Sequence, residues 1–246
     1  MAVPRVFRAL EPAIQKMLDD PELAASCIQI SCKVLTARDA IGDPDRNDFP
    51  LQKGKESLMH AMIKGYAGQA YTDLPGSFEG TLKEVFALLP TDNYRRGAII
   101  AALNAVLRMR GAITNTIHCK DKGPGICSTK LVEKIASEYG KPRIAVIGLQ
   151  PAMVDQLARN YQIRVFDLDP NNIGKEINGV CIENGGECDL DEVDAWCDLI
   201  LATGSTVVNG SIDSLLQMKK PKLFYGTTIA GPAKIMGLNR FCPVST

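Results

Sequence analysis

Four apolar runs in the C-terminal part of the chain decide the fold: KPRIAVIGLQPAMVDQL (141–157), YQIRVFDLDP (161–170), DLILATGSTVVNG (198–210) and PKLFYGTT (221–228). Each run is rich in Val, Ile, Leu or Phe and ends in Gly, Asp or Thr. This pattern is typical of a buried parallel strand that delivers polar groups to the carboxyl edge of a sheet. Because open α/β sheets bind ligands at that edge, we expect a Rossmann-like, mostly parallel sheet over residues 143–246 with a ligand site at its edge.

The ends of these runs supply candidate ligand-binding residues. Gly148 ends the first run, but the remaining glycines of G-x-G-x-x-G are missing, so this loop is poorly suited to bind the pyrophosphate of a dinucleotide. Asp167 follows about 20 residues later, where Rossmann-like sheets place an acid against a ribose hydroxyl. Gly204 permits close backbone approach, and Thr206 and Asn209 could hydrogen-bond a ligand. The same polar residues could instead only solvate a turn or cap a helix.

The N-terminal part predicts a different kind of unit. Helical spacing of apolar residues indicates helices over residues 4–18, 77–89 and 93–109, the last one capped by Thr91 or Asp92. We expect a strand over 26–36 and a strand pair that turns near Gly65 to Gly68. Strands followed by helices, rather than alternating with them, favour an α+β fold.

These patterns predict three segments along the chain. Residues 1–112 form the α+β domain, residues 113–142 form a linker loop and helix, and residues 143–246 form the Rossmann-like domain. The linker helix is expected over STKLVEKIASEYG, where Gly140 is a suitable C-terminal residue.

Composition excludes several classes of protein. The 246 residues are 46% hydrophobic, and 28 basic residues balance 28 acidic ones, so nothing suggests a basic face for nucleic acid. No apolar run approaches the roughly 18 residues of a membrane span. Arg5, Arg8 and Glu11 interrupt any signal peptide. We therefore expect a cytoplasmic protein that binds neither nucleic acid nor membrane.

The best metal candidate is the linker loop. None of the eight cysteines forms a C-x-x-C motif, so reduced thiols, several of them buried, are the simplest interpretation. Residues 116–128, TIHCKDKGPGICS, nevertheless place His118, Cys119 and Cys127 together, and imidazole with thiolate suits transition metals such as Zn, Ni, Co, Cu or Fe. We expect Cys127 to precede a helix N-terminus, which would lower the pKa of its thiol.

Three ligands are too few to complete a structural tetrahedron. A fourth ligand would come from elsewhere in the chain, from water, or from a second subunit, which would make the protein a homodimer. The alternative is that these three residues only pack in a loop.

Two polar features of the N-terminal unit remain. One is a set of residues around the expected strand pair that could face the same cleft or form a solvated surface. The set consists of Lys53, Lys55, Glu56, Gln69, Thr72 and Asp73. The other is His60, which alternates with apolar residues, so we expect a hydrogen-bonded strand residue rather than a metal ligand.

The order of the turns carries a resemblance. V-I-G-x-x-P from Val146, Asp167 with Pro170, ATGST-x-x-N-G, and YGTT-x-x-GPA follow a helix that reads AALNAVL. This order resembles the family named for putative heavy-metal chelation, domain of unknown function 364. The resemblance implies an enolase N-terminal-like domain followed by a Rossmann-like domain. It also implies a ligand cleft at Gly148, Asp167, Gly204, Thr206, Asn209, Gly226 and Thr228.

These observations lead to one expected function and two alternatives. We expect a small-ligand-binding protein that holds a heavy metal or a metal chelate in a cleft between its domains. The first alternative is an enzyme that uses an adenosine-containing cofactor, either S-adenosylmethionine or a nucleotide, with Asp167 on the ribose. The second is a binding or regulatory module without chemistry. No Ser-His-Asp, paired-carboxylate or Walker signature is present, so no catalytic residue can be named.

Overall fold

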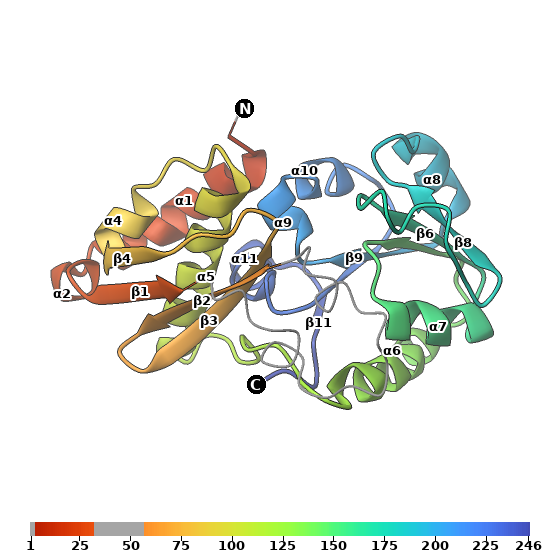
Figure 1. Ribbon diagram of the computed structural model, residues 1–246, viewed down its shortest axis with the longest axis horizontal. Helices are drawn as coiled ribbons and strands as arrows, with labels where there is room; N and C mark the ends of the chain where they lie inside the picture. The colour runs from red at the N-terminus through yellow and green to blue at the C-terminus, as the bar shows by residue number, and fades with distance from the viewer. Residues whose placement is uncertain (1–2, 32–56) are drawn as a thin grey trace.

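The computed structural model describes residues 3–31 and 57–246, which form a mixed α/β structure with two separate sheets. Figure 1 shows the smaller sheet and its helices on one side of the molecule and the larger sheet on the other, with α5 and α11 between them. No helix in these two ranges is long and apolar enough to cross a membrane. The predicted α/β class is therefore confirmed.

The N-terminal unit is built on an antiparallel four-stranded sheet with the order β3-β2-β1-β4. The strand pair turns at Lys64 and Gly65, which both have a positive φ, as the sequence indicated. The elements in chain order are α1 (Arg5–Leu18), α2 (Pro21–Ala24), β1 (Cys27–Ser31), β2 (Ser57–Ile63), β3 (Tyr66–Thr72), β4 (Phe78–Thr81), α4 (Leu82–Phe86) and α5 (Asn93–Met109).

The C-terminal unit is built on a seven-stranded sheet with the order β11-β10-β9-β5-β6-β8-β7. Neighbouring strands are parallel except for the short β7. Figure 1 shows α6 and α7 on one side of this sheet and α8 and α10 on the other. The elements are α6 (Gly123–Tyr139), β5 (Ile144–Ile147), α7 (Pro151–Asn160), β6 (Ile163–Asp167), β7 (Glu176–Ile177), β8 (Val180–Asn184), α8 (Leu190–Trp196), β9 (Leu199–Thr203), α9 (Thr206–Asn209), α10 (Ile212–Leu215), β10 (Lys222–Tyr225), α11 (Ala230–Met236) and β11 (Arg240–Phe241).

The parallel register brings the four predicted strand ends to one edge of the large sheet. β5 ends just before Gly148, β6 ends at Asp167, β9 ends just before Gly204 and β10 ends just before Gly226. Since β6, β5, β9 and β10 are neighbours and parallel, these four residues lie side by side. This prediction from the sequence is confirmed.

Helix α5 is the central element of the core. Every residue from Arg96 to Leu107 is buried, so the helix is buried on all sides over this stretch. It contacts β2 and β3 on one side and α9 and α11 on the other. The approach to β3 is so close that a Cβ on Gly68 would lie 2.2 Å from the backbone nitrogen of Ala105.

One hydrophobic cluster consequently runs from α1 and the small sheet, through α5, to one face of the large sheet. A second cluster covers the opposite face of the large sheet beneath α6 and α7. The division into segments at residues 112 and 142 stays a prediction.

Asn104 is the polar residue at the centre of this packing. Its side chain is fully buried in α5. The two hydrogens of the amide nitrogen Nδ2 are shared among three carbonyl oxygens: Gln69 in β3 at 2.9 Å, and Thr227 and Thr228 after β10 at 3.2 Å each. The oxygen Oδ1 accepts from the backbone nitrogen of Gly231 at 2.7 Å. One side chain therefore joins the small sheet to the loop at the edge of the large sheet.

Two predicted helices differ from the structure in extent. The segment expected as one helix over residues 77–89 begins as strand β4, which pairs with β1, and helix α4 starts only after Thr81. Thr81 and Glu84 form a capping box that fixes this start. Helix α6 begins at Gly123, upstream of the expected Ser128, with a proline in its first turn. The expected strand over 26–36 is described only as far as Ser31.

Replacing Asn104 tests the central position of this residue. We expect Asn104→Ala to lower the free energy of unfolding by about 2–4 kcal/mol, because three carbonyl oxygens and one N–H lose a buried partner. Urea unfolding followed by circular dichroism measures the change. Asn160→Ala is the matched control, since its exposed amide bonds only within its own helix, and it should change stability by less than about 0.5 kcal/mol. Equal effects of the two substitutions on stability would contradict the central role of the Asn104 hydrogen bonds.

Candidate functional site

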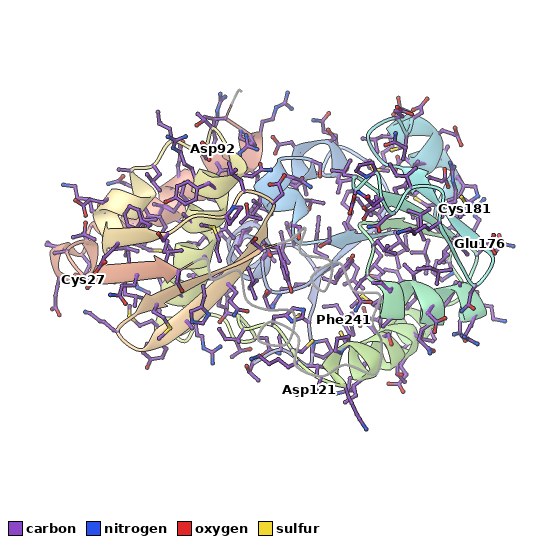
Figure 2. All side chains as sticks on the ribbon, viewed as in Figure 1. Cys27, Asp92, Asp121, Glu176, Cys181 and Phe241 are labelled. Atoms are coloured by element: carbon purple, nitrogen blue, oxygen red, sulfur yellow. The ribbon has the colours of Figure 1, made fainter. Side chains whose placement is uncertain are left out.

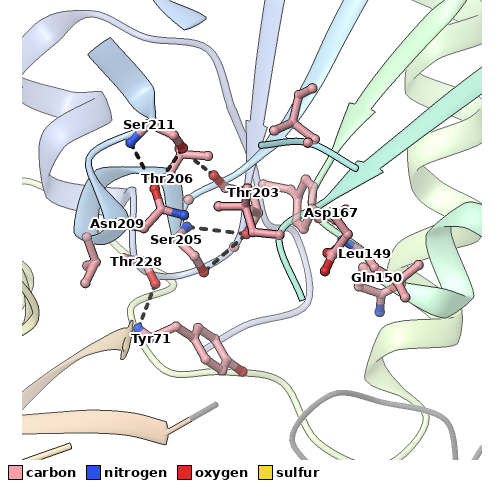
Figure 3. Close-up of a pocket in the computed structure, with 18 of the residues that line it drawn as sticks. Tyr71, Leu149, Gln150, Asp167, Thr203, Ser205, Thr206, Asn209, Ser211 and Thr228 are labelled. Atoms are coloured by element: carbon pink, nitrogen blue, oxygen red, sulfur yellow. Dashed lines mark hydrogen bonds between the residues drawn. The ribbon is translucent and has the colours of Figure 1, made fainter. Parts of the chain in front are cut away.

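A cleft of about 670 Å³ lies between the small sheet and the carboxyl edge of the large sheet. Figure 3 shows loop residues of the large sheet on one side of it and Tyr71 from β3 on the other. All ten residues that the sequence singled out line this one cleft. They are Gly148, Asp167, Gly204, Thr206, Asn209, Gly226, Thr228, His118, Cys119 and Cys127. The structure thus brings together residues that are more than a hundred positions apart in the chain.

The first edge loop depends on a glycine. Gly148 has a φ of +91°, and a Cβ there would lie 2.5 Å from Cγ2 of Thr203. The hydroxyl of Tyr225 donates to the carbonyl oxygen of Gly148 at 2.9 Å. A side chain at position 148 would therefore both strain the backbone and push β9 away.

Asp167 uses its carboxylate to hold two edge loops in place. Oδ2 accepts from the backbone nitrogen of Leu149 at 2.7 Å. Oδ1 accepts from the backbone nitrogen of Asp169 at 2.8 Å and from Nδ2 of Asn172 at 3.2 Å. The sequence placed Asp167 correctly at the edge of the sheet, but it gave no sign of these three bonds. Contact with a ribose stays a prediction.

The loop after β9 also uses polar groups internally. The buried hydroxyl of Thr206 donates to the carbonyl oxygen of Thr203 at 2.7 Å. The side-chain oxygen of Asn209 accepts from the nitrogen and hydroxyl of Ser211 at 2.9 and 2.7 Å. Gly204 is needed because a Cβ there would lie 2.7 Å from the backbone nitrogen of Ile229. These bonds, drawn in Figure 3, fix the shape of the cleft wall.

The loop after β10 joins the two units. Thr228 Oγ1 accepts from the backbone nitrogen of Tyr71 in β3 at 3.0 Å. Gly226 has a φ of +99°, and its carbonyl oxygen accepts from Nε of Arg240 at 2.9 Å. Arg240 also donates to the carbonyl oxygens of Thr114 and Asn115 at the start of the linker loop. This guanidinium therefore ties the linker to the edge of the large sheet.

His118 and three cysteines form the sulfur-bearing wall of the cleft: Cys119, Cys127 and Cys242. Burial, together with a smaller contribution from the nearby Cys242, raises the pKa of the Cys119 thiol to about 12. Burial, together with smaller contributions from Cys242 and Cys119, likewise raises the pKa of the Cys127 thiol to about 12. Both thiols are therefore protonated at neutral pH.

The expectation of a lowered thiol pKa at position 127 is wrong. Cys127 lies inside α6, which begins at Gly123, and its side chain is buried beneath that helix. The cost of burying a thiolate outweighs any benefit from the helix N-terminus. Across residues 3–31 and 57–246, no group of three or more His, Cys, Asp or Glu side chains is arranged to hold a metal ion.

The sequence missed several residues of the cleft. Cys242 was not connected with the linker loop, although it is the third cysteine of this wall. Tyr71 packs edge-on against His118, with ring centroids 5.5 Å apart and an interplanar angle of 83°. The positions of Cys242 and Tyr71 at the cleft depend on the packing of the two units, and no sequence motif predicts them.

The structure describes three of the six polar residues that the sequence grouped around the expected strand pair. Thr72 and Asp73 line the cleft, as the sequence suggested. Gln69 is buried beneath its wall. Lys53, Lys55 and Glu56 lie outside the described residues. His60 lies in β2 and is hydrogen-bonded to Gln69, in agreement with its prediction as a strand residue.

Replacing Asp167 tests its role in shaping the edge. We expect Asp167→Asn to lower the free energy of unfolding by about 1–3 kcal/mol, because an amide nitrogen cannot accept from the backbone N–H groups that the carboxylate now binds. Chemical denaturation measures this difference. Asp191→Asn, on the exposed first turn of α8, should change stability by less than about 0.5 kcal/mol. An Asp167→Asn protein as stable as the wild type would show that these bonds contribute little.

The raised thiol pKa values predict a loss of stability in alkali. The unfolded chain releases these two protons near pH 9, whereas the folded chain retains them to about pH 12. Their contribution to stability is therefore complete below about pH 9 and is lost as the pH rises from 9 to 12. Denaturation between pH 8 and 11 should show a flatter pH dependence for the Cys119→Ala, Cys127→Ala double variant than for the wild type.

The matched control for this experiment is Cys181→Ala. Cys181 is exposed at the far end of the large sheet, away from Phe241 beside the cleft (Figure 2). Its replacement should leave the pH dependence unchanged. Identical pH profiles for the double variant and the wild type would contradict the raised pKa values.

Comparison with known proteins shows a resemblance to one family and a shared fold. Residues 131–233 match the model of the family DUF364, described as putative heavy-metal chelation. A search of curated proteins found no significant match. A DUF364 protein of unknown function from Pyrococcus horikoshii shares 18% identity and a TM-score of 0.52, with 91% of this chain and 79% of that chain covered.

A second solved structure, also of unknown function and from the DUF364 family, comes from Desulfitobacterium hafniense. It shares 12% identity and a TM-score of 0.52, with 94% of this chain and 84% of that chain covered. At these identities the two structures show a shared fold alone. The predicted resemblance to the DUF364 family is therefore confirmed, by sequence over residues 131–233 and by fold over most of the chain.

Proposed function

We propose that the protein binds a small metal complex in the cleft between its two sheets. The observation that carries this proposal is a cleft of about 670 Å³ whose walls combine the polar edge loops with His118 and four cysteines, Cys119, Cys127, Cys188 and Cys242. This volume lies within the usual range for sites that hold an organic ligand. Thiol and imidazole groups suit a soft or borderline metal. The family description, putative heavy-metal chelation, supports a metal as part of the ligand.

A bare ion held only by His118, Cys119 and Cys127 fits the structure less well. Burial raises the pKa of both thiols to about 12, so a metal would have to displace two protons that are held more tightly than those of exposed thiols. These three residues are also not arranged as a ligand set within the described part of the chain. A metal that arrives with its own organic chelator needs fewer ligands from the protein. Cys119 or Cys127 would then add a single soft ligand.

The alternative is an adenosine-containing ligand, S-adenosylmethionine or a nucleotide. It is supported by the position of Asp167 at the end of β6, next to Gly148 at the end of β5. The carboxylate of Asp167, however, already accepts three hydrogen bonds from the protein. A ribose would have to share these acceptors. This arrangement favours the metal complex.

The proposal is tested by comparing a free metal with the same metal in a chelate. Untagged protein, purified without oxygen, is titrated by calorimetry with Ni²⁺ alone and with the nickel–histidine complex. We expect the complex to bind at least tenfold more tightly than the free ion. Affinity should rise with pH, because the contributing thiol must lose a proton that it holds with a pKa of about 12.

Substitutions locate the binding. The Cys119→Ser, Cys127→Ser double variant should lose most of the affinity, whereas Cys181→Ser, exposed and outside the cleft, should keep it. S-adenosylmethionine and ATP are titrated in parallel. Binding of either nucleoside ligand without binding of the nickel complex would favour the alternative, and no binding of any of these ligands would reject the proposal.

A further inference from the structure

Gln69 in β3 is a polar residue with only 6% of its surface exposed, and each of its polar groups has a partner. Its backbone nitrogen donates to the carbonyl oxygen of Thr116 at 3.1 Å, and its backbone oxygen accepts from Asn104 at 2.9 Å. Its side-chain oxygen Oε1 accepts from the backbone nitrogen of His118 at 2.7 Å. Its side-chain nitrogen Nε2 lies 3.1 Å from Nδ1 of His60. Gln69 therefore links β2, α5 and the linker loop.

The direction of each side-chain bond follows from these contacts. A backbone N–H can only donate, so the Gln69 atom that faces His118 must be the oxygen. The other amide atom is then the nitrogen, which donates to Nδ1 of His60. Nδ1 must therefore be unprotonated, and the proton of the neutral imidazole must lie on Nε2.

The loop held by Gln69 enters the cleft directly. His118 and Cys119 both line the cleft, and His118 packs against the ring of Tyr71. Residues 113–119 of this loop belong to no helix or strand, so their position depends on individual hydrogen bonds. Three bonds at Thr116, one of them from its hydroxyl to the carbonyl oxygen of Ala67 at 2.7 Å, hold the loop two residues earlier. A pair of backbone bonds between Ile117 and Thr246 holds the residue before His118. The bond from His118 to Gln69 fixes it at the cleft wall.

We propose that Gln69 is a positioning residue of the cleft. It sets the place at which His118 and Cys119 meet a ligand, and it requires neutral His60 to be in the Nε2–H form. Gln69 lies behind the wall and is not itself among the lining residues. This inference rests on the proposed function only where ligand affinity is concerned. The imidazole form and the loop position are independent of any ligand.

Two substitutions of Gln69 by side chains of similar size test its bonds to His118 and His60 separately. Gln69→Glu keeps an oxygen that accepts from His118 but presents a second acceptor to His60. Neutral His60 should therefore change to the Nδ1–H form, in which it donates to the introduced carboxylate. Gln69→Leu removes both bonds. The forms are read from two-bond ¹H–¹⁵N correlations of the imidazole rings at pH 8, and the chain has only two histidines to assign.

The position of the loop is read from the reactivity of Cys119. Its thiol is half-buried with a raised pKa, so iodoacetamide should modify it slowly in the wild type. Gln69→Leu should increase this rate roughly tenfold, because the loop loses a hydrogen bond at His118. Gln69→Glu should leave the rate near that of the wild type. Modification is followed by mass spectrometry with exposed Cys181 as the internal reference.

Binding of the nickel–histidine complex gives the third measurement. Gln69→Leu should weaken binding roughly tenfold, and Gln69→Glu should largely restore it. If the wild type does not bind the complex, the proposed function fails, while the imidazole form and the Cys119 rate still decide the role of Gln69. If Gln69→Leu does not fold, the reversal of the His60 form in Gln69→Glu decides it.

The inference is overturned by either of two results. One is a wild-type His60 that carries its proton on Nδ1, or that keeps the same form in Gln69→Glu. The other is an unchanged Cys119 rate in a folded Gln69→Leu protein. A reversed His60 form together with a faster Cys119 reaction supports it.

Discussion

The fold depends on the burial of one helix between two sheets. Helix α5 has no exposed face over two thirds of its length, because β2 and β3 cover one side and α9 and α11 cover the other. Small residues make this possible, since Gly68 and Gly231 bring neighbouring backbone within contact of the helix. Asn104 bonds to both units at once through four buried hydrogen bonds. Its four hydrogen bonds require the small sheet and the edge loop to keep one relative position, because each broken bond would leave a buried polar group without a partner.

The cleft follows from this constraint. Its walls come from both units, and bonds that cross between them, such as the one from Tyr71 to Thr228, lie directly at its surface. The edge loops are also braced internally by Asp167, Thr206 and Asn209. Such a site is shaped before a ligand arrives, which lowers the entropic cost of binding. These three residues, which the sequence predicted as ligand-binding residues, therefore stabilise the loops that form the cleft.

The chemistry of the cleft is set by burial as much as by residue type. Cysteines next to a histidine in the sequence suggest a metal site, yet burial raises the pKa of two of these thiols to about 12. A buried thiol is a weak ligand until its proton is displaced, which is why we propose a metal that is already chelated. The hydrogen bonds of Gln69 similarly decide how His118 enters the cleft, although Gln69 itself carries no charge and lies behind the wall.

The sequence by itself determined the class of fold, the parallel strands and the edge residues. Apolar runs with a polar end specify a buried strand locally, so Gly148, Asp167, Gly204 and Gly226 could be placed at one edge without knowledge of their neighbours. Local signals also fixed the start of α5 and the turn at Gly65, but they failed over residues 77–89, where pairing with β1 overrides helical spacing. Only the tertiary structure decided that Cys242 joins Cys119 and Cys127, that Asp167 bonds to two loops, and that Asn104 and Gln69 join the units. These properties depend on contacts between segments that are far apart in the chain and on how deeply each group is buried. Local sequence patterns predict neither the contacts nor the burial.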